Sequence, residues 1–180
     1  MTTRILVTTG PESSGKTTLA RDLSLQLGAP LVTEASRDYL TSLYARQPGT
    51  AYQSGDLLEI ARLQIQREQA ALAQEPPWLV CDTDLLVIVI WSEVKYGGCD
   101  PALLDLFNTS LQQAPRHYLL CDHNIPWESD PLREHPFARG QLYQRYLDKL
   151  QQLELAVTAV RGTPQQRLQQ ALLPVTHTQS

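Results

Sequence analysis

The sequence predicts a single α/β domain over residues 1–180, with a five-stranded parallel sheet covered by helices on both faces. Short apolar runs, typical of buried strands, alternate along the chain with longer segments of helical periodicity. The strands are continuous apolar runs, as expected when both faces of a parallel sheet are buried. With 42% hydrophobic and 19% charged residues, the chain can form one packed core.

Five short apolar runs predict the strands. The first contains Ile5-Leu6-Val7 and is followed by Gly10, which is typical of a strand that ends in a turn. The third follows Pro76-Pro77 and ends at Asp82. The expected strands cover residues 4–9, 31–32, 78–81, 117–121 and 155–160.

The segments between these runs predict helices. In the first of them, apolar residues from Leu19 to Leu27 share one helical face, and Gly28 ends the helix. The segment 85–95 contains a Val-Ile-Val-Ile stretch that a strand could also carry, but a buried helix is the preferred interpretation. The expected helices cover residues 16–27, 35–45, 55–74, 85–95, 101–112, 138–153 and 164–173.

A glycine-rich motif lies between the first strand and the first helix, with the pattern Gly-x4-Gly-Lys-Thr over residues 10–17. Glycines allow close backbone approach, successive N–H groups form an anion nest, and the helix N-terminus adds positive potential. Lys16 is expected to reach the terminal phosphates, and the Thr17 hydroxyl to bind Mg²⁺. The motif predicts a P-loop NTPase fold, with nucleotide contacts from Gly10, Glu12, Ser13, Ser14, Gly15, Lys16, Thr17 and Thr18.

Acidic residues follow two of the expected strands. Asp82 ends the third strand, where an aspartate that organises Mg²⁺ belongs, and Asp84 follows it. One of the two could instead cap the next helix. Glu34 and Arg37 follow the second strand, at the sheet edge where α/β proteins bind ligands. Glu34 could accept a proton from a substrate hydroxyl or bind a ribose, or the two could form a solvated pair.

Two later segments could close or complete the site. The polar, proline-rich stretch from about residue 124 to 139 predicts a lid that excludes water, with Arg133 and Arg139 as cations for a transferring phosphoryl group. Either arginine could equally be an ordinary surface residue. Arg167 follows the fifth strand, where the sheet edge could contact adenine, although a plain strand-to-helix turn is the alternative.

Composition excludes several other classes of protein. The net charge is -4 and no block of Lys or Arg stands out, so no nucleic-acid partner is expected. The longest apolar run, Leu85 to Trp91, is too short to span a membrane, and no secretion signal is recognisable, so a cytoplasmic location is expected. The three cysteines and four histidines show no metal-ligand spacing, and Cys81 and Cys121 are expected to be buried. Oligomeric state is left open.

The chain resembles the nicotinamide riboside kinase domain of the NadR-type regulators of NAD salvage. The resemblance follows the chain in order, through the P-loop and then through the stretches 33–39, 81–84, 124–127 and 130–133. Asp82-Thr83-Asp84, and the Pro-Trp and Pro-Leu-Arg stretches, are more discriminating than the P-loop. One departure is Ala35-Ser36, where the family has a tyrosine followed by a small residue. The family's DNA-binding and adenylyltransferase segments have no counterpart in these 180 residues.

The resemblance implies transfer of the ATP γ-phosphate, with Mg²⁺, to the ribose 5'-hydroxyl of nicotinamide riboside, giving nicotinamide mononucleotide. The nicotinamide ring is cationic, which suits the carboxylates of Glu34, Asp82 and Asp84. Aromatic side chains that could stack on it are Tyr39, Trp91, Tyr96 and Trp127, although each could be a core residue.

Two other functions remain open. A different nucleoside kinase or a nucleoside monophosphate kinase would share the motif, and a monophosphate acceptor would need further cations near Arg37. A P-loop regulatory ATPase or switch is the second alternative. The GTPase base-reading motif is absent from the sequence, and Thr83 follows Asp82 where many ATPases carry a glutamate that activates water.

Overall fold

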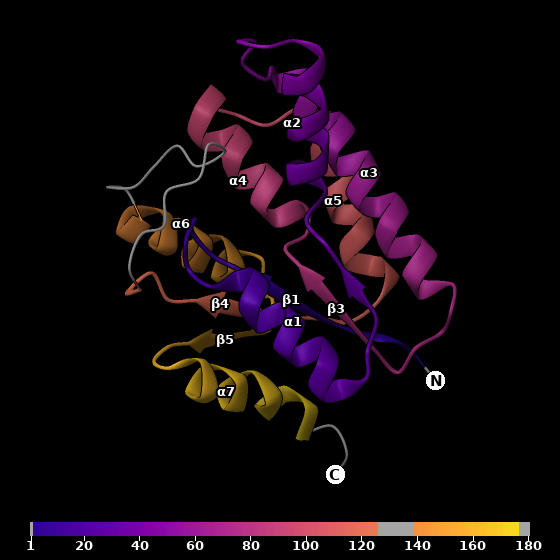
Figure 1. The fold of residues 1–180 in the computed structure, drawn as a ribbon, viewed down its shortest axis with the longest axis vertical. Helices are drawn as coiled ribbons and strands as arrows, with labels where there is room; N and C mark the ends of the chain where they lie inside the picture. Colours follow the sequence, from indigo (N-terminus) through magenta and orange to yellow (C-terminus); the bar gives the residue numbers. More distant parts are fainter. Residues whose placement is uncertain (1, 126–138, 177–180) are drawn as a thin grey trace.

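A computed structural model describes residues 2–125 and 139–176. Within them, five parallel strands form one sheet in the order β2-β3-β1-β4-β5 (Figure 1). The strands are β1 (Arg4–Thr9), β2 (Leu31–Val32), β3 (Trp78–Asp82), β4 (Arg116–Cys121) and β5 (Val157–Val160). Because β1 lies between β3 and β4, the strand order reverses there, and the loop after β1 lies where α/β sheets bind ligands.

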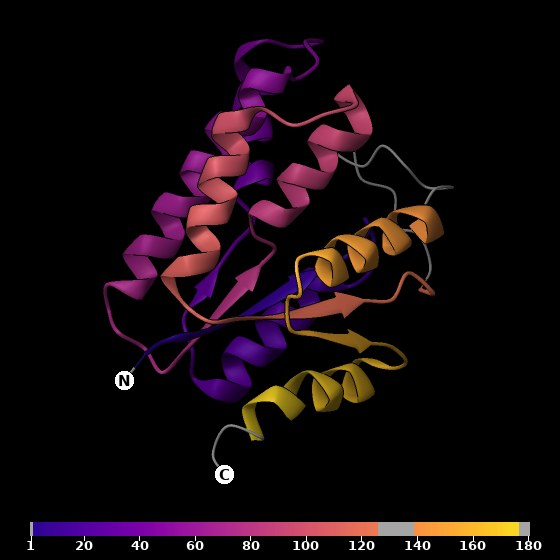
Figure 2. The same cartoon turned by 180° about the vertical axis from the view of Figure 1, so that it is seen from behind.

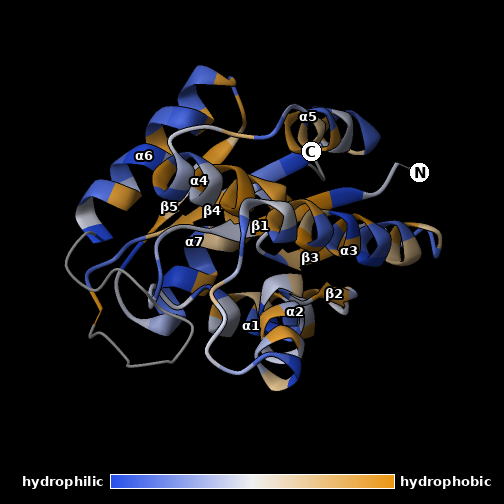
Figure 3. Cartoon of the chain, turned by 90° about the horizontal axis from the view of Figure 1, so that it is seen from above, coloured by the Kyte–Doolittle hydropathy of each residue, from blue (hydrophilic) through white to orange (hydrophobic). Residues whose placement is uncertain are grey.

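Helices cover both faces of this sheet, as the front and back views show (Figures 1 and 2). The described residues form α1 (Lys16–Leu27), α2 (Ala35–Arg46), α3 (Ser54–Leu72), α4 (Leu85–Tyr96), α5 (Pro101–Gln113), α6 (Arg139–Gln152) and α7 (Pro164–Thr176). Alternate residues of β1 point to opposite faces: Leu6 joins a cluster with α1 and α7, while Ile5 and Val7 join a larger cluster with α2 to α6. The apolar strands therefore lie inside three layers (Figure 3).

The predicted fold class is confirmed, including the helix at 85–95. Two end signals explain why the Val-Ile-Val-Ile stretch is helical: Asp84 Oδ1 accepts a hydrogen bond from Leu86 N at 3.0 Å, and Gly97 ends α4 with a φ of 74°. All residues from Leu85 to Ile90 are buried, so the stretch is a helix that is apolar on every side.

Some predicted boundaries are wrong by one to three residues. The fifth strand begins at Val157 rather than 155, because Glu154 has a φ of 52° and Leu155 N still bonds to Leu150 O at the end of α6. The third helix ends at Leu72, and Glu75 turns the chain with a φ of 50°. The last helix continues past Pro174 to Thr176. Residues 126–138 of the predicted lid lie outside the described residues.

The three cysteines, all within the described part of the chain, form no disulfide. Cys81 and Cys121 are buried, as predicted, and Cys99 is half-buried between α4 and α5. Burial raises the pKa of the Cys121 thiol to about 12. In residues 2–125 and 139–176, no helix combines the length and the apolar character needed to cross a membrane.

Candidate active site

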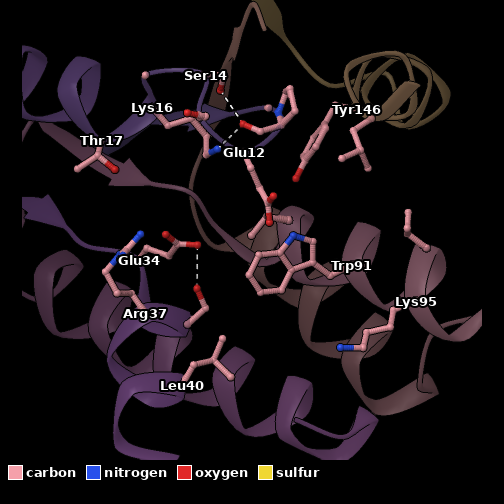
Figure 4. Close-up of a pocket in the computed structure, with 18 of the residues that line it drawn as sticks. Glu12, Ser14, Lys16, Thr17, Glu34, Arg37, Leu40, Trp91, Lys95 and Tyr146 are labelled. Atoms are coloured by element: carbon pink, nitrogen blue, oxygen red, sulfur yellow. Dashed lines mark hydrogen bonds between the residues drawn. The ribbon is translucent and has the colours of Figure 1, made fainter. Parts of the chain in front are cut away.

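A cavity of about 310 Å³ opens beside the P-loop (Figure 4). It is lined by the loop itself, by the starts of α1 and α2, and by side chains from α4 and α6. The residues that line it include Gly10, Glu12, Ser13, Ser14, Gly15, Lys16, Thr17, Thr18, Glu34, Arg37, Tyr52, Trp91, Lys95 and Tyr146. The structure therefore brings together all predicted P-loop residues, Glu34, Arg37 and Trp91.

The P-loop backbone depends on its glycines. Gly10 has a φ of 131°, and a Cβ there would lie 2.8 Å from the carbonyl oxygen of Cys121 at the end of β4. Gly15 has a φ of 78°, and Ser13 also adopts a positive φ of 55°. Only glycine tolerates the Gly10 position without strain, so the tight turn follows directly from the motif.

Lys16 folds over this turn. Its Nζ donates a hydrogen bond to the Pro11 carbonyl oxygen at 2.7 Å, and the Ser14 hydroxyl donates to the same oxygen at 2.8 Å (Figure 4). Thr17 and Thr18 begin α1 with exposed side chains that line the cavity. A flexible ammonium group and two hydroxyls at a helix N-terminus form a site suited to a phosphate chain.

Glu34 presents a carboxylate to the same cavity. It precedes α2, and its Oε1 accepts a hydrogen bond from the Ser36 hydroxyl at 2.8 Å. Burial raises the pKa of Glu34, while the charge of Lys16 and the Ser36 hydroxyl act against the rise. A carboxylate with a raised pKa near a phosphate site has the character of a general base.

Asp82 and Asp84 are placed differently from each other. Asp82 ends β3, with its Oδ1 3.5 Å from the Thr8 hydroxyl of β1, and its charge contributes to the raised pKa of Glu34. Neither aspartate is among the residues that line the cavity. Asp84 is 1% exposed and caps α4, which confirms the alternative prediction of a helix cap.

Asp84 also belongs to a buried cluster of four residues, Glu68, Asp84, Arg116 and Tyr118. Arg116 Nη2 lies 2.7 Å from Glu68 Oε2 and its Nη1 lies 3.3 Å from Asp84 Oδ2, to which the Tyr118 hydroxyl also donates at 2.8 Å. Burial raises the pKa of both carboxyl groups against the opposing effect of Arg116. The predicted contact of Asp84 with substrate is therefore corrected: its oxygens already have protein partners.

The aromatic predictions have mixed outcomes. Trp91 lines the cavity, with its ring centroid 6.5 Å from that of Tyr52. Tyr39 and Tyr96 are not among the lining residues. The Tyr39 hydroxyl instead bonds to Asp56 at 2.7 Å, which together with burial raises its pKa to about 12. The Tyr96 hydroxyl donates to the Tyr52 carbonyl oxygen. Trp127 lies outside the described residues.

Among the cavity residues that the sequence did not predict are Tyr52, Lys95 and Tyr146. The Lys95 ammonium group lies 3.5 Å from the centroid of the Tyr52 ring. Tyr146 of α6 is 2% exposed, and Figure 4 shows its hydroxyl turned toward Glu12. Burial and the charges of Glu34 and Glu12 raise the pKa of Tyr146 well above its usual range, so it remains a hydrogen-bond donor. No local motif marks these residues, because they converge only through packing.

The predicted arginines behind the P-loop contact its backbone. Arg167 is 6% exposed and donates to the carbonyl oxygens of Ser14 at 2.6 Å and Asp122 at 3.1 Å. Arg139 donates to the Ile125 carbonyl oxygen at 2.9 Å and to that of Ser13 at 3.3 Å. Arg133 lies outside the described residues. Arg167 and Arg139 therefore support the loop that would hold a phosphate.

A second cavity of about 150 Å³ adjoins the other side of the P-loop. Its lining residues come from the P-loop, from α1, from the segments that follow β4 and β5, and from the start of α7: Gly15, Thr18, Leu19, Asp22, Ile125, Gly162, Pro164 and Arg167. The predicted turn around Arg167 therefore forms a pocket beside the phosphate loop, with apolar walls that suit a flat ring.

The donor set also fits the predicted magnesium ion. Mg²⁺ prefers oxygen ligands and is usually held by one or two protein groups together with water and substrate phosphates. The Thr17 hydroxyl lines the cavity and offers one such oxygen, and the Asp82 carboxylate, which lies outside the lining at the end of β3, offers another. For the part of the chain that is described, no group of three or more His, Cys, Asp or Glu side chains could hold a metal by itself.

Solved structures share this fold. A NadR protein in complex with NR aligns with a TM-score of 0.71 and 17% identity over 89% of this chain, which spans only 46% of that one. A thymidylate kinase from Ehrlichia chaffeensis aligns over 100% of both chains with a TM-score of 0.62 and 15% identity. A deoxyadenosine kinase from M. mycoides aligns over 97% of this chain and 98% of that one, with a TM-score of 0.57 and 14% identity.

No curated protein matches the chain in sequence. A family profile described as an AAA domain, in contrast, matches residues 5–167. The match begins within β1 and ends at the arginine that supports the P-loop, so it includes the loop, Glu34 and both aspartates. This match covers most of the chain, including the residues that line the cavity. The chain therefore belongs to the AAA domain family.

Proposed function

We propose that this protein is an ATP-dependent kinase that phosphorylates the ribose 5'-hydroxyl of a nucleoside, with nicotinamide riboside as the leading acceptor. The observation that carries the proposal is the continuity of the cavity, which runs from the P-loop past Glu34 to Tyr52 and Trp91. A phosphate donor on the loop and an acceptor against the aromatic end would share one space, which favours direct transfer between them.

The residues support a simple transfer step. The acceptor oxygen bonds to the terminal phosphorus, the bond from that phosphorus to the bridging oxygen breaks, and a nucleoside diphosphate leaves. The proton of the acceptor hydroxyl passes to the Glu34 carboxylate. Lys16 neutralises negative charge on the transferring group, and its hydrogen bond to Pro11 is exchanged for one to phosphate. Mg²⁺ held through Thr17 and Asp82 would supply further charge neutralisation.

The second cavity is the best place for the adenine base of the donor. It lies against Gly15 and Thr18, so a nucleotide could span the P-loop with its base on one side and its phosphates on the other. Leu19, Ile125 and Pro164 give it apolar walls. This arrangement supports the proposed contact between adenine and the segment that contains Arg167.

The acceptor assignment rests on the other end of the main cavity. Glu12 and Glu34 supply two carboxylates, and Trp91 supplies an aromatic ring for a cationic pyridinium. The structurally similar NadR protein was solved with NR, and another NadR structure with NAD and AMP-PNP. At 17% identity these relatives support the proposal through the fold they share with this chain.

A second candidate is a nucleoside monophosphate kinase. Arg37 and Lys95 both line the acceptor end, so two cations lie where an acceptor phosphate would need them. The same charges disfavour a cationic acceptor. The similar thymidylate kinase fold is compatible with this alternative.

A screen of acceptors tests the proposal. The protein is incubated with ATP, Mg²⁺ and either nicotinamide riboside, an uncharged nucleoside or a nucleoside monophosphate, and products are identified by mass spectrometry. A phosphorylated nucleoside that is absent with Lys16→Ala supports the proposal. A phosphorylated monophosphate supports the second candidate. Hydrolysis of ATP with no phosphorylated acceptor would overturn both and leave a regulatory ATPase.

A further inference from the structure

Gln64, in the middle of α3, lies under the start of α2. Its side chain is fully enclosed, with 2% of the residue exposed. Its Oε1 accepts a hydrogen bond from the backbone N–H of Ala35 at 3.0 Å, across 29 positions of sequence. Ala35 is the first residue of α2 and directly follows Glu34.

This bond satisfies one of the N–H groups that the start of a helix leaves without a partner. The first N–H groups of a helix have no partner within the helix, and the residue before the helix usually supplies a side-chain acceptor. Glu34 occupies that position in α2 but makes no side-chain capping bond. Its carboxylate accepts from Ser36 and lines the cavity instead. Gln64 thus fixes the backbone N–H next to Glu34, while the Glu34 carboxylate remains in the cavity.

Gln64 lies one helical turn from the buried cluster that contains Glu68 and Arg116. Glu68, one helical turn later on α3, is 0% exposed and forms the ion pair with Arg116. Gln64 Nε2 and Glu68 Oε1 are a buried donor and a buried acceptor four residues apart on this helix. Burial raises the pKa of Glu68, and hydrogen bonding from Gln64 lowers it against that effect. The buried cluster can thus hold Gln64 from below.

The support reaches the opposite wall of the cavity as well. Arg116 joins Glu68 to Asp84, and Asp84 caps α4 through Leu86 N. Two turns further on, α4 places Trp91 in the cavity. One line of buried polar groups therefore runs from the start of α2 to the start of α4.

We propose that Gln64 is a positioning residue for Glu34, which holds the start of α2 so that the Glu34 carboxylate faces the reacting hydroxyl. The inference rests on the proposed kinase function for its effect on rate. The structural claim is that Gln64 fixes the backbone and the carboxylate of Glu34. This claim can be tested without measuring any reaction.

Gln64→Met is the test variant, because methionine fills the space but accepts no N–H bond. Gln66→Met is the matched control, since Gln66 lies on the exposed side of α3. In Gln64→Met, amide exchange at Ala35 should be about fivefold faster or more, because the N–H loses its acceptor; fivefold corresponds to about 1 kcal/mol. The titration of the Glu34 carboxyl, followed by ¹³C NMR, should shift. Neither should change in Gln66→Met.

Kinetics then separate positioning from stability. We expect Gln64→Met to lower kcat about tenfold and to shift the pH-rate profile, while KM for ATP stays unchanged. Gln64→Glu should restore part of kcat, because a carboxylate oxygen can accept a hydrogen bond from the Ala35 N–H. Unchanged Ala35 exchange and Glu34 titration in a folded Gln64→Met protein would overturn the inference. If Gln64→Met does not fold, amide exchange at Ala35 in Gln64→Glu is the test: a rate close to wild type supports the inference, and a rate at least about fivefold faster would overturn it. If the wild type phosphorylates no acceptor, the proposed function fails. The two NMR measurements still decide whether Gln64 positions Glu34, because they require no reaction.

Discussion

The cavity and the buried cluster beneath it are made from the same kinds of side chain. In the cavity, the Glu34 carboxylate faces the charge of Lys16, and both line a space of about 310 Å³. In the cluster, Glu68 and Asp84 flank Arg116 at 2.7 and 3.3 Å, and each of these side chains is at most 1% exposed. Charge pairing therefore does not distinguish a reactive site from a structural one. The two differ in accessibility: the charged groups of the cavity line a space that a ligand can enter, whereas those of the cluster contact only other protein groups.

The largest effect expected on activity comes from Lys16→Ala. Loss of the ammonium group that stabilises the transferring phosphate should lower kcat by about 10³-fold or more, while the unfolding temperature changes little because Lys16 lies at the cavity wall. Phosphate transfer and thermal unfolding are measured together. Lys149→Ala, which removes a partly buried lysine that pairs with Glu93 outside the cavity, is the control. Turnover retained in Lys16→Ala would contradict the proposed role of the P-loop.

Arg116→Met should produce the largest loss of stability. It leaves Glu68 and Asp84 without their shared cation, and breaking a buried pair costs about 3–5 kcal/mol. Burial already raises the pKa of both carboxyl groups, and loss of the Arg116 charge should raise it further. At low pH the two groups then become protonated, which removes the cost of burying their charges. The free energy of unfolding, measured with urea, should therefore fall less at pH 5 than at pH 8.

A surface arginine on the same helix as Glu68 serves as the control for this experiment. Arg62 pairs with Glu59, and both side chains are more than half exposed. Arg62→Met should change the free energy of unfolding by about 1 kcal/mol or less at either pH. Equal effects of the two arginine substitutions would remove the contrast between surface and buried pairs.

Glu34→Gln should lower kcat by about 10²-fold, because general base catalysis is worth at least that factor. In the wild type, the rate should rise with pH as Glu34 ionises, and the raised pKa places this rise above the usual range for glutamate. The variant should lack the rise. For stability the sign is opposite: a raised folded-state pKa favours the protonated form, so the contribution of Glu34 to stability is lost as pH rises through that pKa. A rise in rate that persists in Glu34→Gln would assign the base elsewhere.

The smallest effect sharpens the comparison between the two aspartates. Asp82→Asn should raise the Mg²⁺ concentration needed for half-maximal activity by about tenfold, which is about 1.4 kcal/mol. Asp84→Asn should leave that concentration unchanged and lower the free energy of unfolding, because Asp84 holds Arg116 and the start of α4. Activity across a Mg²⁺ titration and urea unfolding are measured for both. A shift in the Mg²⁺ requirement with Asp84→Asn would return that residue to the site.

The P-loop was predictable because its function is local. Glycine spacing, the preceding strand and the following helix lie within about two dozen residues, and the conformation of Gly10 follows from that pattern. Asp82 and Asp84 were harder, because position in sequence could not say which of two neighbouring carboxylates would meet Arg116, 32 positions beyond Asp84. Tyr146 and Lys95 reach the cavity only when α6 and α4 pack beside the P-loop. Pairing across such distances is a property of the tertiary fold, and local periodicity carries no information about it.

Cys99 offers a practical consequence of how the thiols are distributed. Cys81 and Cys121 are sealed in the core, whereas Cys99 is partly accessible just past the end of α4, the helix that carries Trp91 and Lys95. Burial raises the pKa of Cys99 as well, so alkylation should be fastest in mildly alkaline buffer. A maleimide dye could then be attached at a single native position, without engineered cysteines.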